Sequence, residues 1–337
     1  MIGRRALTLG AVALAAPASH AQTRVMQGTK ERAVRFAGSG GATLSGTLLL
    51  PMASEMQYVP GVVLIAGSGP TDRDGNNPLV PVRIDSLKQI AETLVGAGIA
   101  TLRYDKRGIG ASTASPSTLA EQERFFTWEN FVGDAQAAHA ELLKHDEIKP
   151  YATALLGHSE GGLLALAVAP SISWRPPHGI VLASTPGYAL DEIVRRQMAR
   201  NAPTFLDAAK RVMSAIRDTG HAPSDVPREL QSLFPSYIGP FLRGAMAFDP
   251  AKALIAIDTA CLLLHGGADN QIVPLGDIQP LLDALGRRSG AGEALVAPAV
   301  SHNLKAVSGP ADPGFSGPLA PAIADKLTSW LRFLLSA

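Results

Sequence analysis

Residues 152–169 read ATALLGHSEGGLLALAVA, and the interpretation of the whole chain starts from this stretch. The apolar run Thr153–Leu156 predicts a short buried strand, and Leu163–Ala169 predicts an apolar helix. Between them stands Gly157-His158-Ser159-Glu160-Gly161, a G-x-S-x-G sequence. A serine placed in this way between a strand and a helix is typical of a tight, strained turn that exposes its hydroxyl. Ser159 is therefore the predicted nucleophile.

The turn around Ser159 needs small neighbours, and Gly157, Gly161 and Gly162 supply that room. A glycine-rich phosphate-binding turn is the alternative interpretation. The sequence here lacks both spacings that such turns use, G-x-x-x-x-G-K-[ST] and G-x-G-x-x-G.

Strands and helices alternate on both sides of this stretch. Further strands are predicted at Ala42–Leu50, Gly61–Ala66, Ile99–Tyr104, Gly179–Ala183, Ala260–Leu264 and Ala294–Ala297. Further helices are predicted at Ile84–Gly96, Trp128–His145 and Ile323–Leu335. This alternation predicts an α/β fold with a mostly parallel central sheet and helices on both faces.

The alternation stops between Tyr188 and Pro250. Three helical stretches are predicted there, Asp191–Asn201, Phe205–Asp218 and Val226–Met246, the last broken near Pro235 or Pro240. We therefore expect a helical cap, residues 188–250, inserted into a core made of residues 22–187 and 251–337. The apolar side chains of the last stretch, at helical spacing, are expected to belong to a core rather than to a substrate pocket.

A serine hydroxyl needs a base to become a nucleophile, and eight histidines are available. His302 is the preferred candidate because it follows the last predicted strand, and the base comes last in hydrolases with this motif order. The side chain of His158 should point away from the nucleophile. Asp269 is the predicted acid because it follows the strand Ala260–Leu264, which places it at the carboxyl edge of the sheet.

The negative oxygen that forms during acyl transfer needs two backbone N–H donors. One is expected from Glu160, directly after the nucleophile. The other should come from the loop Gly67-Ser68-Gly69-Pro70. Pro70 has no N–H, so Ser68 or Gly69 must donate, and Ser68 is preferred.

Two charged segments invite other interpretations. Residues 72–76, DRDGN, do not have the spacing of a calcium-binding EF-hand loop, and a polar loop bonded to its own backbone is expected. Contact of Arg73 or Asp74 with a substrate is the alternative. Residues 105–108, DKRG, are expected to form a structural turn with an internal ion pair.

The amino terminus resembles an export signal. Residues 1–21 contain paired arginines, a short apolar stretch and small residues before a predicted cleavage bond between Ala21 and Gln22. The paired arginines resemble those of a twin-arginine signal, and the general secretory route is the equal alternative. The expected location is periplasmic or secreted, without stable membrane insertion.

Composition excludes several functions. The 337 residues carry 30 basic and 29 acidic side chains, so the formal net charge is +1 and a nucleic-acid partner is not expected. Cys261 is the single cysteine, which excludes a cysteine zinc site and an internal disulfide framework. It should be a small buried apolar side chain.

Taken together, the motifs AGSGPTDRDGN, RYDKRGIGAS, GHSEGG, HGGAD and SHNLK resemble, in this order, those of the alpha/beta-hydrolase superfamily. The resemblance covers nearly all of the chain from Val34 to Leu335. It is strongest to bacterial carboxylesterases of the dienelactone-hydrolase-like and serine-aminopeptidase-like branch. It implies a Ser159–Asp269–His302 triad, an oxyanion hole formed by Ser68 and Glu160, and no cofactor or metal.

The expected activity is hydrolysis of a small-molecule carboxylic ester through an acyl-enzyme. An acyltransferase, a lactonase, or an amidase or peptidase would use the same triad and differ only in pocket shape. A binding module without catalysis is a further alternative. The substrate, its acyl chain length and the oligomeric state are not predicted.

Overall fold

A computed structural model describes residues 28–52 and 58–336. The predicted signal peptide lies outside these residues and stays a prediction. Eight strands of the described chain form one sheet in the order β1-β2-β4-β3-β5-β6-β7-β8. Their bounds are β1 Thr29–Ala37, β2 Thr43–Pro51, β3 Val59–Ile65, β4 Ala100–Tyr104, β5 Ile148–His158, β6 Gly179–Ala183, β7 Ala260–Gly266 and β8 Gly292–Ala297.

The sheet is parallel from β4 to β8, whereas β1 pairs antiparallel with β2 and β2 pairs antiparallel with β4. The predicted, mostly parallel sheet is therefore confirmed. The edge strand β1 was not predicted, because only two alternate side chains near its end are buried and the others are exposed or partly buried. An edge strand with one solvated face lacks the continuous apolar run that marks a buried parallel strand.

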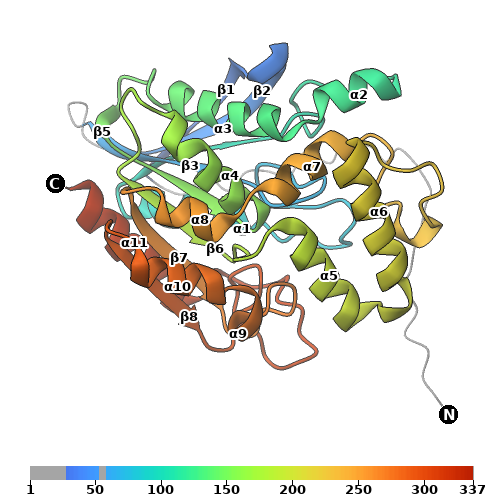
Figure 1. Ribbon diagram of the computed structural model, residues 1–337. Helices are drawn as coiled ribbons and strands as arrows, with labels where there is room; N and C mark the ends of the chain where they lie inside the picture. The colour runs from blue at the N-terminus through green and yellow to red at the C-terminus, as the bar shows by residue number, and fades with distance from the viewer. Residues whose placement is uncertain (1–27, 53–57, 337) are drawn as a thin grey trace.

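Helices cover both faces of the sheet (Figure 1). Their bounds are α1 Ser86–Gly96, α2 Leu119–Phe125, α3 Trp128–Leu142, α4 Glu160–Val168, α5 Leu190–Asn201, α6 Leu206–Thr219, α7 Gly239–Ala247, α8 Pro250–Ile255, α9 Pro274–Asp277, α10 Gln279–Arg287 and α11 Pro321–Leu335. Side chains of β3 alternate between the two layers. Val63 and Ile65 join the core with α3, α4 and α10, whereas Val62 and Leu64 join the core with α1 and α11.

The segment between β6 and β7, residues 184–259, is described throughout and contains helices and no strand. The third predicted helix begins only at Gly239, with Pro240 in its first turn, where a missing N–H costs nothing. Phe241 of α7 packs against Trp128 and Phe131 of α3, with ring centroids 5.8 and 4.9 Å apart. As expected, the apolar side chains of this stretch belong to a core.

Residues 28–52 and 58–336 contain no helix that is both long enough and apolar enough to cross a membrane.

Candidate active site

Ser159 lies on a sharp turn between β5 and α4. Its backbone has φ 55° and ψ −121°, a conformation that residues with a side chain rarely adopt. Its N–H donates to the carbonyl of Ala183 at the end of β6, over 2.8 Å. The side chain is partly exposed, and among the described residues its hydroxyl makes no hydrogen bond. The turn therefore presents a free, accessible hydroxyl at the carboxyl edge of the sheet.

The predicted reason for the glycines is confirmed. A Cβ atom on Gly157 would collide with the backbone of Gly161, and one on Gly161 would collide with the carbonyl of Ile65 in β3. A Cβ on Gly162 would collide with the side chain of Thr185. The turn can pack against β3 and against the segment after β6 only because these positions carry no side chain.

The structure brings Asp269 and His302 together. Nδ1 of His302 lies 2.7 Å from Oδ2 of Asp269, and both side chains are buried. The other carboxylate oxygen of Asp269 accepts the backbone N–H groups of Gln271 and Ile272 at 2.8 and 2.9 Å. Burial raises the pKa of Asp269, but the charge and hydrogen bond of His302, together with the charge of His265 and the N–H of Ile272, leave this pKa below its ordinary value. Asp269 is therefore ionised at neutral pH and holds one imidazole nitrogen.

Two side chains hold the backbone of His302. Nε2 of His158 lies 2.9 Å from the carbonyl oxygen of His302, and the hydroxyl of Ser184 donates to the same oxygen over 2.8 Å. The His158 side chain is thus engaged with the backbone of His302. Burial, and then the charge of His302, lower the pKa of His158 to about 4, so it is neutral at pH 7. Because His158 adjoins Ser159, this contact also ties the nucleophile turn to the histidine loop.

A second histidine contacts Asp269. Nε2 of His265 lies 3.3 Å from Oδ2 of Asp269 and 2.7 Å from the carbonyl of Ile272. Burial lowers the pKa of His265, although Asp269 partly offsets it. Neither His265 nor Ser184 is among the site residues predicted from the sequence. The spacing His265-Gly-Gly-Ala-Asp269 is the one sequence feature that could have indicated a role for His265. No sequence feature indicates a role for Ser184.

The loop after β3 packs beside the nucleophile. A Cβ atom on Gly67 would lie 3.3 Å from Cβ of Ser159. Among the described residues, the backbone N–H groups of Ser68 and Gly69 have no hydrogen-bond acceptor. Glu160 is the first residue of α4, and the first N–H groups of a helix have no partner inside it. The backbone therefore offers unpaired donors on two sides of Ser159.

The expectation of an internal ion pair in residues 105–108 is wrong. Each of the three charged side chains has a distant partner: Asp105 pairs with Arg73 at 2.7 Å, Arg107 with Asp134 at 2.7 Å, and Lys106 with Glu160 at 3.8 Å. Each of these three residues lies 27 to 54 positions away from its partner in the chain. Only the tertiary structure could pair them.

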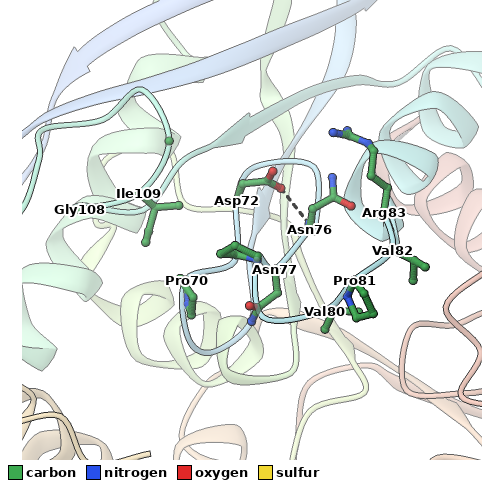
Figure 2. A pocket seen from close by; sticks show the side chains of 12 residues that line it. Pro70, Asp72, Asn76, Asn77, Val80, Pro81, Val82, Arg83, Gly108 and Ile109 are labelled. Carbon is green, nitrogen blue, oxygen red and sulfur yellow. Dashed lines mark hydrogen bonds between the residues drawn. The ribbon is translucent and has the colours of Figure 1, made fainter. Parts of the chain in front are cut away.

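The polar loop at residues 72–76 is held by its own backbone, as expected. Oδ1 of Asp72 accepts the N–H groups of Asp74 and Asn76 at 2.9 and 2.8 Å. A cavity of about 580 Å³ opens beside this loop (Figure 2). It is lined by Pro70, Asp72, Asn76, Asn77, Pro78, Val80, Pro81, Val82, Arg83 and Gly108–Gly110. The cavity shares Pro70 with the loop next to Ser159, and its lining contains none of the three predicted triad residues.

The sheet order, the strained serine turn and the Asp269–His302 pair after β7 and β8 define a protein with the alpha/beta-hydrolase fold. Comparison with known proteins agrees. Residues 83–234 match the family described as serine aminopeptidase, S33. The chain is 30% identical to esterase EstD of Thermotoga maritima over 242 residues, which is 68% of this chain and 50% of that protein. The chain thus spans half the length of this curated relative.

Solved structures share the fold over most of the chain. Acetyl xylan esterase 1 from Thermoanaerobacterium sp. superimposes with a TM-score of 0.56 and 16% identity, covering 92% of this chain and 84% of that one. Est1E from Butyrivibrio proteoclasticus, solved with ferulic acid bound, gives a TM-score of 0.54 and 16% identity, covering 89% and 98%. The chain therefore has the alpha/beta-hydrolase fold, and part of it is similar to serine hydrolases of that fold.

Proposed function

We propose that this chain is a serine esterase that cleaves small carboxylic esters through a Ser159–His302–Asp269 triad. Two observations carry the proposal: the Asp269–His302 hydrogen bond, and a serine held at φ 55° on the nucleophile turn. Esterases among the similar proteins, EstD and the acetyl xylan esterase, support the ester as the substrate class.

The proposed reaction runs in two halves. The Ser159 hydroxyl attacks the ester carbonyl while Nε2 of His302 accepts its proton, because Nδ1 is engaged by Asp269. The N–H groups of Glu160 and Ser68 stabilise the negative oxygen of the tetrahedral intermediate. That intermediate collapses, His302 returns the proton to the departing alcohol, and an acyl-Ser159 ester remains. Water, deprotonated by His302, then releases the carboxylic acid and restores the serine.

The direct test is labelling of the purified protein with a fluorophosphonate, followed by peptide mass spectrometry. We expect modification at Ser159 in the folded protein and none after heat denaturation. Ser159→Ala should remove both labelling and turnover of p-nitrophenyl acetate, while its thermal unfolding stays close to that of the parent. Ester turnover that survives in Ser159→Ala would exclude the proposed nucleophile.

The similarity to serine aminopeptidases makes amide cleavage the second candidate. Aminoacyl p-nitroanilides and p-nitrophenyl esters of matched acyl groups separate the two activities. We expect turnover of the esters, and efficient cleavage of the anilides at Ser159 would instead assign a peptidase. A folded protein that neither labels nor turns over any of these compounds would favour a binding module.

A further inference from the structure

We propose that Lys106 is a positioning residue that orients the oxyanion hole by holding the Gly67–Gly69 loop, and that Glu160 keeps this lysine in place. The inference rests on the proposed function, and nothing in the nucleophile motif itself points to the lysine. Lys106 follows β4, so the tertiary structure brings it to the loop after the neighbouring strand β3.

Lys106 is buried, with 3% of its surface exposed, and its ammonium group donates to two backbone carbonyls of the loop. These are the carbonyls of Gly67 and, over 2.9 Å, of Gly69. A third contact, 3.8 Å long, joins the ammonium group to Oε1 of Glu160. Burial of a lysine is energetically unfavourable, because burial disfavours the charged form of its side chain. Here the ammonium group donates its hydrogen bonds to a single loop. Burial lowers its pKa, and Glu160 offsets part of that effect.

The planarity of the peptide bond links the lysine to the oxyanion donor. The carbonyl of Gly67 and the N–H of Ser68 belong to one trans peptide unit, in which they point in opposite directions. A carbonyl held by Lys106 therefore turns the Ser68 N–H away from the lysine and leaves it unpaired. The carbonyl of Ser68 is held in turn by the Thr71 hydroxyl at 2.7 Å. Each carbonyl of Gly67–Gly69 is thus held by a side chain, and the loop lies next to Ser159 at Gly67.

Glu160 connects Lys106 to the other side of the proposed oxyanion hole. Its backbone N–H is the second proposed donor, while its side chain contacts Lys106. The pair therefore couples the two donors across the nucleophile turn. Burial raises the pKa of Glu160, and Lys106 acts against that rise, so the pair is electrostatically interdependent. The lysine also opposes the repulsion that the Glu160 carboxylate would exert on a developing oxyanion.

The test uses Lys106→Met and compares p-nitrophenyl acetate with p-nitrophenyl thionoacetate. Sulfur is larger than oxygen and accepts hydrogen bonds poorly, so the preference for the oxygen ester measures how well the oxyanion hole is aligned. We expect kcat for the oxygen ester to fall by about tenfold to a hundredfold with KM little changed. The oxygen-to-sulfur ratio of kcat/KM should fall with it. A ratio that stays at the parent value would overturn the inference.

Lys305→Met is the matched control. Lys305 is also buried, and its ammonium group also donates to two carbonyls, those of Ile84 and Phe315, outside the Ser68 loop. We expect this variant to lose thermal stability and to keep the parent ratio. If Lys106→Met does not fold, as judged by circular dichroism, Lys106→Gln takes its place. The shorter, uncharged side chain should also lower the ratio, and an unchanged ratio would again refute the role.

The double variant Lys106→Met/Glu160→Gln separates positioning from simple charge neutralisation. Under the proposal the ratio stays low, because the carbonyls remain unheld. Recovery of the parent ratio would show that Lys106 only neutralises Glu160. Failure of the proposed function looks different. In that case the parent protein itself hydrolyses neither ester and Ser159 resists the fluorophosphonate, and the inference falls with it.

Discussion

Ser159 illustrates how a single residue can be held in an unfavourable conformation. Its φ of 55° is strained for a residue with a side chain, and the cost is of the order of 1–3 kcal/mol. Two features hold the turn in this conformation. They are the close packing at Gly157 and Gly161 and the hydrogen bond from the Ser159 N–H to the carbonyl of Ala183. The strain exposes the hydroxyl that the proposed reaction needs.

At the same scale, Asp269→Asn should separate geometry from charge. The asparagine keeps the shape and can still accept the N–H groups of Gln271 and Ile272. It would no longer stabilise an imidazolium at His302, and it favours the wrong tautomer. We expect kcat for p-nitrophenyl acetate to fall by about 10⁴-fold with little loss of stability. Steady-state kinetics and thermal unfolding measure this. Activity within tenfold of the parent would assign the acid to another residue.

Helix α5 clamps the loop that carries the backbone donors to Asp269. Arg200 of α5 pairs with the fully buried carboxylate of Asp277 at 2.9 Å and donates to the carbonyl of Gln271 at 3.2 Å. Gln197 of the same helix donates to that carbonyl as well. The N–H of Gln271 in turn donates to Asp269. The helical insertion is therefore connected to the proposed acid indirectly, through the short loop that contains Gln271.

Arg200→Met should lower the free energy of unfolding by about 1–3 kcal/mol, because it removes charged hydrogen bonds from a buried carboxylate. Arg211→Met on α6 is the control. Its partner Asp225 is exposed, so the expected change stays within about 0.5 kcal/mol. Urea denaturation of both variants gives the comparison. Equal losses in the two variants would mean that the Asp277 clamp adds no stability.

Across the whole molecule, buried neutral histidines link folding to pH. His139 on α3 is buried against β5, where its Nε2 lies 2.9 Å from the hydroxyl of Thr153. Burial lowers its pKa from 6.5 to about 4. Between these values the unfolded chain binds a proton that the folded chain does not. Stability is therefore fully present above pH 6.5 and declines as the pH falls toward 4.

We expect His139 to contribute roughly 3 kcal/mol to this loss when the pH falls from 7 to 4. His139→Gln removes the titrating group and should flatten the dependence of the unfolding free energy on pH. Replacement of the exposed His178 by glutamine serves as the control. Chemical denaturation at pH 7 and pH 5 checks the difference. An unchanged slope in His139→Gln would show that this histidine is not the linked group.

Local sequence patterns were sufficient for the fold class and most of the elements. Continuous apolar runs predict buried parallel strands, and the strand from Gly179 to Ala183 agrees with β6 residue for residue. The position of a residue after a strand was enough to nominate Asp269 and His302, because all parallel strands end at the same edge. The serine turn could be recognised because the G-x-S-x-G motif is local in sequence, although Gly161 and Gly162 make room for Ile65 and Thr185 from other segments.

Tertiary structure alone decided what joins segments far apart in the chain. The partners of residues 105–107, the contact of His158 with the His302 backbone, and the position of Lys106 under the Ser68 loop all depend on which strands become neighbours. An ion pair leaves no periodic signal in sequence, and a charge next to another charge suggests a local partner. Local backbone preferences and apolar periodicity depend on residues that are close in the chain, so the strands and helices could be predicted directly from the sequence. Buried charges choose partners only after the sheet order has placed them together.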